Sequence, residues 1–221
     1  MPTISPTIDR TINTISSGIS SISALMQLSA GSQVNQVAAT SFQTLDYTDI
    51  NIAQVIIWVA EFDTSDINTA PSSATLKIYG KTNSQADVIC AKTTLASAGA
   101  IVTGDWDAWN PTSPTAYTNT IDSSDWSTSG YNDFTFNATA LSDMASLDEF
   151  QMVCMEATYA YTLTSNPQFN IVSGFYTSYE SGTDKDPYID YTAAAGWVPK
   201  KYTLKVKSSK LNVKDGKLLI K

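Results

Sequence analysis

Short apolar stretches separated by Ser- and Thr-rich segments restrict the fold of this chain more than any other feature. The clearest stretch, residues 53–62 (AQVIIWVAEF), is rich in β-branched and aromatic residues, which favour strands. Further strands are predicted at residues 74–79, 86–93, 133–137, 150–159, 169–176 and 188–191. Short strands with polar turns between them are typical of a sandwich or barrel. The 221 residues therefore predict one all-β domain with short additional segments at its ends.

The N-terminal segment, residues 1–30, has a different pattern. Its apolar residues alternate in spacings of four and three, at Ile8, Ile12, Ile15, Ile19, Ile22 and Met26. This heptad pattern predicts a short helix, and isoleucine at both core positions favours trimers or larger bundles. The Thr, Asn, Ser and Gly residues between them are poor helix formers, which favours an extended arm instead. Both alternatives are open, and the first makes the isoleucines candidate assembly contacts.

The C-terminal segment, residues 196–221, predicts a small β-meander appended to a sandwich of residues 31–195. Runs with apolar residues and lysines lie at 202–207 and 211–214, and a third, wholly apolar run lies at 218–220. Asp215-Gly216 separates the last two runs and is a strong hairpin signal. Lysines on strands protect exposed edges from aggregation. Alternatively they dock the chain onto an acidic neighbour, which makes candidate assembly contacts of Lys205, Lys207, Lys214 and Lys217.

Charge is divided unevenly along the chain. The net charge is −8 and the pI is about 4.4. Residues 200–221 hold eight lysines and one acid, which leaves five of the 13 basic residues and 20 of the 21 acids for residues 1–199. The first part therefore carries a net charge of −15 and the second a net charge of +7. Such an acidic body argues against a nucleic-acid partner.

The chain has no sequence signal for export or for a membrane. It begins Met1-Pro2-Thr3-Ile4-Ser5-Pro6 and stays polar, unlike a secretory signal with its basic start and apolar stretch. No apolar run is long enough to cross a membrane. The sequence predicts a soluble protein made in the cytoplasm.

The two cysteines, Cys90 and Cys154, both lie inside apolar strand-like runs. Free cysteine in such a setting behaves as a small core residue. We expect buried thiols, with a disulfide between the two as the alternative.

Catalytic patterns are scarce, and we expect no enzyme. The chain has no histidine, which removes Ser-His-Asp and Cys-His arrangements and the usual zinc sites. It has no glycine motif for phosphate binding. Glycosidases need only two acids, and four residues qualify by type, although they are interpreted as turn residues in solvated loops: Asp105, Asp107, Asp122 and Asp125.

The loop Asp105-Trp106-Asp107-Ala108-Trp109 offers a candidate ligand site. A sugar stacks well on an exposed Trp106 or Trp109, with Asp105 and Asp107 as hydrogen-bonding partners. The same carboxylates could hold calcium, although the spacing is not that of an EF-hand, and no other cofactor is expected. The alternative interpretation is that the tryptophans cap the sandwich core and that the aspartates serve turn chemistry.

Three segments carry a resemblance to a known family. They are Phe62–Ile67 followed by Ser73–Tyr79, then Trp126–Thr139 (WSTSGYNDFTFNAT), and Phe175–Tyr191, which closes the matching region. Residues 53–192 resemble the DNRLRE-type jelly-roll domains, which are related to carbohydrate-binding modules and occur in bacteriophage structural proteins. The resemblance implies a jelly-roll β-sandwich and a virion setting, with no active site to carry over. In such a sandwich we expect core positions at Phe62, Leu76, Tyr79, Phe134, Phe136, Phe175 and Tyr191.

The sequence and the resemblance together predict a structural virion protein of a bacteriophage, made in the host cytoplasm and displayed on the particle surface. A capsid decoration protein and a head or tail fibre subunit both fit. Its partners would be other virion proteins and copies of itself, with a trimer favoured by the isoleucine pattern. The alternative is a carbohydrate-binding adhesion module that contacts glycans through Trp106 and Trp109.

Overall fold

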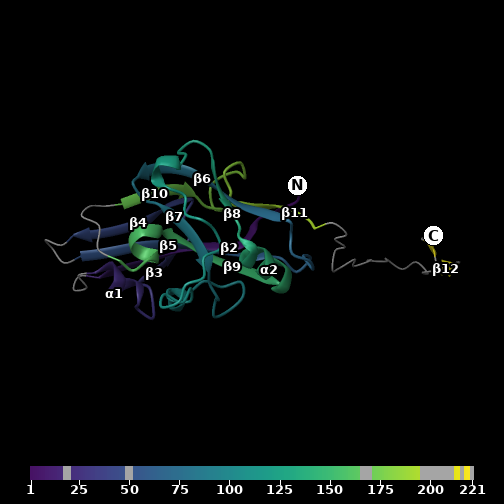
Figure 1. Ribbon diagram of the computed structural model, residues 1–221, viewed down its shortest axis with the longest axis horizontal. Coiled ribbons are helices and arrows are strands. Elements are labelled where there is room, and N and C mark those ends of the chain that lie inside the picture. Colours follow the sequence, from purple (N-terminus) through teal and green to yellow (C-terminus); the bar gives the residue numbers. More distant parts are fainter. Residues whose placement is uncertain (17–20, 48–51, 165–170, 195–211, 215–216, 220–221) are drawn as a thin grey trace.

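The computed structural model describes residues 1–16, 21–47, 52–164, 171–194, 212–214 and 217–219. Strands dominate these residues and pair antiparallel, so the protein is an all-β sandwich, as predicted (Figure 1). None of the helices in these ranges is long and apolar enough to cross a membrane.

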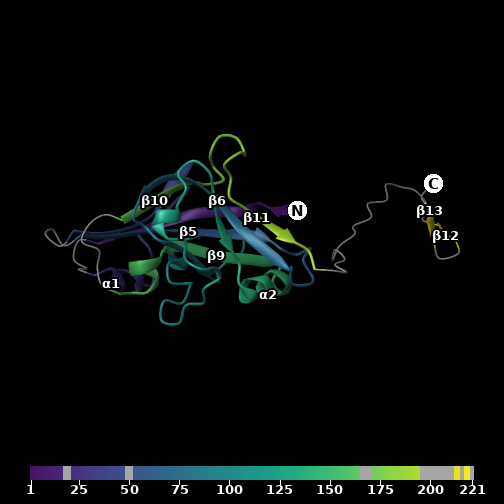
Figure 2. The same ribbon diagram turned by 45° about the horizontal axis from the view of Figure 1, so that its top comes forward.

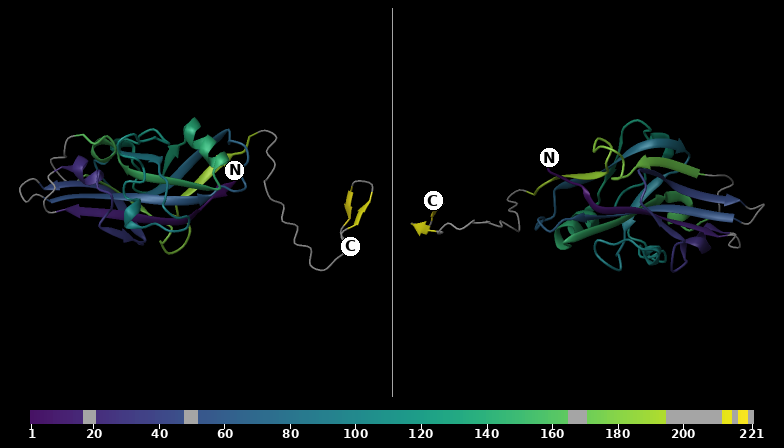
Figure 3. Two further views of the ribbon diagram at one scale, coloured as in Figure 1. Left: turned by 90° about the horizontal axis from the view of Figure 1, so that it is seen from below. Right: turned by 180° about the vertical axis from the view of Figure 1, so that it is seen from behind.

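Two layers of strands face each other, and we call them sheet A and sheet B (Figure 3). Sheet A has the order β1 (Thr3–Ile4), β11 (Tyr188–Thr192), β6 (Ser73–Ser84) and β8 (Tyr131–Thr135). Sheet B has the order β7 (Val88–Lys92), β9 (Glu149–Glu156), β5 (Ile52–Asp63), β2 (Pro6–Ser16) and β3 (Gln33–Asn35). The sheets are joined because β5 pairs with β4 (Ala39–Tyr47), β4 with β10 (Ile171–Tyr176), and β10 with β6. The seven strands predicted from apolar stretches are β5 to β11, and all are confirmed.

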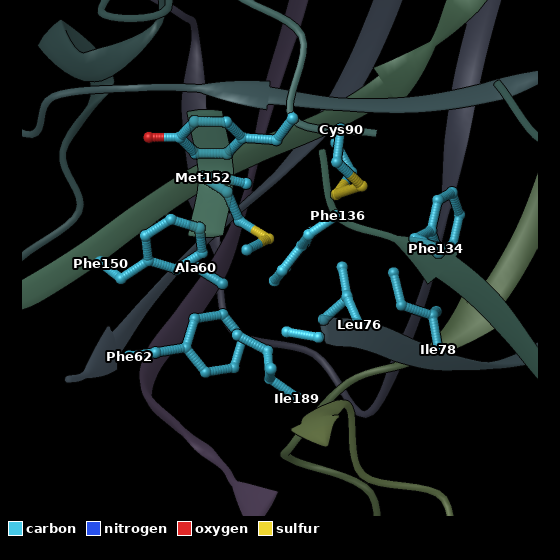
Figure 4. Close-up of a cluster of buried hydrophobic side chains, with 14 of the residues drawn as sticks. Ala60, Phe62, Leu76, Ile78, Cys90, Phe134, Phe136, Phe150, Met152 and Ile189 are labelled. Atoms are coloured by element: carbon cyan, nitrogen blue, oxygen red, sulfur yellow. A yellow bond between two sulfur atoms is a disulfide. The ribbon is translucent and has the colours of Figure 1, made fainter. Parts of the chain in front are cut away.

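The main core lies between the two sheets (Figure 4). Alternate residues of each strand face inward, as Trp58 and Ala60 do in β5 and Met152 does in β9. Six of the seven predicted core residues are buried here: Phe62, Leu76, Phe134, Phe136, Phe175 and Tyr191. The prediction for Tyr79 is wrong, because Leu76 and Ile78 face inward and the alternation turns Tyr79 to the outer face of sheet A.

The cysteines form a disulfide, so the expectation of buried thiols is wrong. Cys90 in β7 and Cys154 in β9 lie directly opposite each other across an antiparallel pair, with their Cα atoms 4.1 Å apart. Figure 4 shows the bond inside the inter-sheet core, near Met152 and Phe136. The sequence could not decide this, because the pairing depends on the register of two strands that are 64 residues apart.

A second apolar cluster covers the outer face of sheet B. It contains Val55, Ile57 and Val59, the residues of β5 that alternate with the inward-facing ones. The cover consists of α1 (Ile22–Met26), the turn η1 (Thr103–Asp105) with the loop after it, and the single π-helical turn η3 (Ala157–Tyr161). β5 is therefore buried on both faces, which accounts for its nearly continuous apolar sequence.

The N-terminal segment is part of the sandwich and is extended over residues 6–16, so of the two open interpretations the isoleucine helix is wrong there. Residues 6–16 form β2, which pairs with β5 along ten positions. Ile12 of β2 and Ile22 of α1 are buried in the second cluster, Ile8 packs against it, and Ile15 is 49% exposed. Ile19 lies outside the described residues. Because Ile12 and Ile22 are buried within the chain itself, the pattern no longer supports a trimerising helix, and the described part of residues 1–30 belongs to the sandwich.

The remaining elements are short. The helix α2 (Ala138–Ser146) is capped by Asn137, whose side chain accepts a hydrogen bond from the backbone nitrogen of Ala140 at 3.1 Å. The turn η2 (Ser123–Asp125) precedes β8. The predicted C-terminal hairpin is confirmed, since β12 (Asn212–Lys214) pairs antiparallel with β13 (Lys217–Leu219). The predicted strand at residues 202–207, with Lys205 and Lys207, lies outside the described residues.

Candidate functional site on the outer face of sheet A

The predicted glycan site on Trp106 and Trp109 is not present at the surface. Trp106 is 0% exposed and Trp109 is 2% exposed. The Trp106 indole nitrogen donates to the carbonyl oxygen of Leu25 at 3.0 Å, which ties the loop to the end of α1. Trp109 stacks on Tyr161 of η3 with ring centroids 6.0 Å apart. Both rings belong to the cover over sheet B, so neither offers a face to a sugar.

The acids of the same loop do not form a ligand site. Asp105 is 2% exposed and accepts hydrogen bonds from the backbone nitrogens of Ala96 at 2.9 Å and Val102 at 2.8 Å. These two bonds hold residues 96–105 together as a closed loop. Asp107 is partly exposed. Asp122 precedes the turn η2 and Asp125 is its last residue, and both are exposed. Within the described ranges, no group of three or more His, Cys, Asp or Glu residues could hold a metal ion, so the calcium interpretation has no support.

Three further buried carboxylates hold loops in place. Asp9 of β2 accepts from the Trp58 indole nitrogen at 2.9 Å and from the Ser178 backbone nitrogen at 3.3 Å. Glu61 of β5 accepts from the backbone nitrogen of Gly99 at 3.0 Å. Glu156 accepts three backbone hydrogen bonds at the start of η3. Because backbone and side-chain N–H groups of the chain satisfy them, these acids have a structural role.

Four tyrosines gather on the outer face of sheet A and of the adjoining strand β10, and we call them the tyrosine face. They come from four strands: Tyr79 (β6), Tyr131 (β8), Tyr176 (β10) and Tyr188 (β11). Tyr131 contacts Tyr79 and Tyr188 edge-to-face, with ring centroids 5.2 Å apart in both pairs, and Tyr79 contacts Tyr176 at 5.9 Å. All four are partly exposed. The sequence analysis did not predict this face. A signal was present, because β6, β8 and β11 each have a tyrosine two residues from a charged residue. Side chains two residues apart point to the same face of a strand, so this pattern indicates an exposed face.

Two lysines already lie over rings of the tyrosine face. Lys185 lies over Tyr176 at 4.5 Å and over Tyr79 at 5.9 Å from the ring centroids, and Lys81 lies over Tyr176 at 5.4 Å. Lys185 belongs to the loop between β10 and β11, which rises above the sheet in Figure 2. The Tyr131 hydroxyl donates to the Asp184 carbonyl oxygen of this loop at 2.9 Å. Burial, and then the nearby Tyr188 and Asp186, raise the pKa of Tyr131 to about 12, so the hydroxyl stays a donor at neutral pH.

The other two tyrosines each border a polar hollow. A hollow of about 280 Å³ is lined by Thr3, Ser5, Thr183, Asp186 and Tyr188. A second, of about 290 Å³, is lined by Tyr131 together with Asp125, Ser127, Asn132 and Asp133, among others. The contact between Tyr131 and Tyr188 therefore lies between two hollows that both contain carboxylates.

Asp186 is the least satisfied carboxylate of this region. Its Oδ1 atom is buried and has no hydrogen-bond partner among the residues that the structure describes. Burial raises its pKa above the ordinary value, and the nearby acids Asp9, Asp184 and Glu180 raise it further. A positively charged group in the hollow would relieve both effects.

These features define the candidate site as an aromatic face that carries both lysines and carboxylates, with Lys77 paired to Asp133 at 2.7 Å. Comparisons of the chain with protein-family models and with curated proteins find no match.

Proposed function

We propose that this chain is a non-catalytic structural protein carried on the surface of a bacteriophage particle. The sandwich would be the displayed body, and residues 200–221 would attach it to an acidic neighbouring virion protein. Both a capsid decoration protein and a head or tail fibre subunit fit this role. The virion setting is supported by the resemblance of residues 53–192 to phage DNRLRE-type jelly-roll domains.

The charge division of the chain is the observation that carries the proposal. Among the described residues, the main core extends as far as Ala193, which packs against it. Eight lysines then follow within 22 residues, whereas residues 1–199 carry a net charge of −15. Segregated charge of this kind suits electrostatic docking to an acidic partner.

The disulfide adds support for work outside the cell. Disulfides persist on virion and cell surfaces, whereas the cytosol keeps thiols reduced. The bond between Cys90 and Cys154 lies in the core, where oxidation after release from the host would fix the folded body. The alternative of a carbohydrate-binding module has lost its two candidate contacts, because Trp106 and Trp109 are buried.

Deletion of residues 200–221 is expected to abolish incorporation into particles and to leave the sandwich folded. Mass spectrometry of particles purified from the phage that encodes the chain would measure incorporation. Thermal unfolding of the purified variant would check that the body is intact. Incorporation at the level of the full chain would contradict the proposal.

A further inference from the structure

We propose that the peptide bond between Asp186 and Pro187 is a self-cleavage site, at which the Asp186 carboxyl attacks its own backbone carbonyl carbon. The bond lies just before β11, at the end of the loop that rises above sheet A in Figure 2. Cleavage divides the chain into residues 1–186 and 187–221. This inference does not rest on the particle setting.

The residue pair itself has the required chemistry. Asp186-Pro187 is the one Asp-Pro pair in the sequence, which has eight prolines. An aspartate carboxyl can close a five-membered ring on the carbonyl carbon of its own residue, and attack within one residue avoids the entropy cost of bringing two groups together. The proline nitrogen carries two alkyl substituents, which make it more basic than other peptide nitrogens. It is therefore the better leaving group once it is protonated.

The Asp186 carboxyl is free to attack. Its buried Oδ1 atom has no hydrogen-bond partner among the described residues. A nucleophilic oxygen without a hydrogen bond keeps its lone pairs available, so no such bond has to break before the attack. Other buried acids of the sandwich differ in this respect, because Asp9, Asp105 and Glu61 each accept hydrogen bonds.

Tyr131 contacts the carbonyl group that is attacked. Its hydroxyl lies 2.9 Å from the Asp184 carbonyl oxygen and 3.3 Å from that of Asp186, so its one hydrogen is shared between them. During the attack the Asp186 oxygen gains negative charge and becomes the stronger acceptor, which strengthens the bond to it. The edge-to-face contacts of Tyr131 with Tyr79 and Tyr188 fix the position of this donor.

The reaction balances with water as its co-reactant. A side-chain oxygen of Asp186 forms a bond to the backbone carbonyl carbon, and the carboxyl proton passes to the Pro187 nitrogen. The C–N bond breaks, which leaves a cyclic anhydride on Asp186 and a free amine on Pro187. Water then opens the anhydride and gives the two carboxyls of a C-terminal aspartate. Asp186 lines the hollow of about 280 Å³, which is large enough to admit that water.

The surroundings of Asp186 extend the reaction to higher pH. The carboxyl supplies the proton, so cleavage requires its protonated form. Burial raises the pKa of Asp186, and the negative charges of nearby acids raise it further. In the unfolded chain the pKa returns to its ordinary value, so the folded chain should be cleaved at pH values at which the unfolded chain stays intact. The ionisable groups around the carboxyl are Asp9 of β2, Glu180, Asp184 and Lys185 of the loop, Tyr131 of β8 and Tyr188 of β11.

The products should stay together in the folded sandwich. β11 pairs with β1 on one side and with β6 on the other, and its residues Ile189 and Tyr191 are buried in the main core. Cleavage therefore removes the covalent connection between residues 1–186 and the basic segment but leaves β11 in its sheet. Both cysteines lie within residues 1–186, so no disulfide joins the two products.

Acid incubation of the full chain tests the proposal. The folded chain and the chain unfolded in urea are held at pH values from about 4 to 6, with far-UV circular dichroism as the check on folding. We expect denaturing mass spectrometry to find residues 1–186 and 187–221, with masses that sum to the intact mass plus one water. The folded chain should be cleaved at least about tenfold faster than the unfolded chain at the same pH. Equal rates, or a folded chain that stays intact, would overturn the proposal.

The variant Ser113→Asp supplies a reference bond within the same molecule. It places a second Asp-Pro pair before Pro114, at an exposed position where the new carboxyl is hydrated. In the unfolded chain the two bonds should be cleaved at similar rates, because only the local chemistry acts there. In the folded chain the bond after Asp186 should be cleaved first. Similar rates in the folded chain, or the opposite order, would overturn the proposal.

Two further substitutions separate the carboxyl from the hydroxyl. Asp186→Glu, which would need a larger ring, should reduce cleavage of the folded chain to background. Tyr131→Phe keeps the ring and removes the hydroxyl, so it should slow cleavage by about tenfold or more. The pH dependence, which Asp186 sets, should be the same in Tyr131→Phe as in the native chain. An unchanged rate in either variant would overturn the proposal.

Discussion

Replacing both cysteines, as Cys90→Ala with Cys154→Ala, should lower the free energy of unfolding by about 4 kcal/mol. The disulfide closes a loop over a sequence separation of 64 residues, and a loop of this length restricts the unfolded chain strongly. Both cysteines are 0% exposed, so the substitutions also remove packed sulfur atoms from the core. Urea unfolding of the two proteins would measure the difference.

Reduction provides the matched control for this prediction. A reductant should destabilise the native protein under conditions that open the core and should leave the double-alanine variant unchanged. The intact mass of the native protein should be lower than that of the dithiol by two hydrogen atoms. A native mass that corresponds to two thiols would contradict the disulfide, and a loss below about 1 kcal/mol would contradict its stabilising role.

Trp106→Ala should cost about 3–5 kcal/mol, because it leaves a large cavity in the cluster over sheet B. The substitution also removes the hydrogen bond to the Leu25 carbonyl oxygen, which holds α1 against the loop. Trp106→Phe should cost less, since it keeps an apolar ring and loses mainly that bond, which is worth about 1 kcal/mol. Thermal unfolding would give the order, with Val102→Ala, at a 48% exposed position, as a neutral control.

Hydrogen exchange would show where the Trp106 effect acts. Protection should be lost first in α1 and in the loop around Asp105, while β6 and β8 of sheet A stay protected. A Trp106→Ala variant as stable as the native protein, but deficient in sugar binding, would restore the glycan interpretation of this loop.

The sequence predicted the strands whose apolar residues are continuous or alternate, and these are the strands around the main core. β5 is the clearest case, because its alternate residues serve two buried faces, with Trp58 and Phe62 on one and Val55 and Ile57 on the other. The sequence did not predict β2, because its buried positions include Asp9, Thr11 and Thr14, polar residues that usually indicate solvent exposure. Asp9 is acceptable in the interior only because Trp58 and Ser178 donate to it. That information lies in the tertiary structure.

The candidate site was the least predictable part. The sequence directed attention to Trp106 and Trp109 by residue type, but the cover over sheet B buries them. The tyrosine face combines residues from four strands, and their proximity follows from sheet order rather than from any local motif. The predicted core position of Tyr79 was wrong by a single residue. In an alternating strand, a shift of one residue moves a side chain from the core to the surface.

The most direct test of attachment through the basic segment is the copy number of the chain on purified particles. Lys205, Lys207, Lys214 and Lys217 should be changed together to glutamine in one variant and to arginine in another. We expect the glutamine variant to be lost from the particles and the arginine variant to be retained, because arginine keeps the charge. Equal copy numbers of the glutamine variant and the native chain would contradict attachment through these lysines.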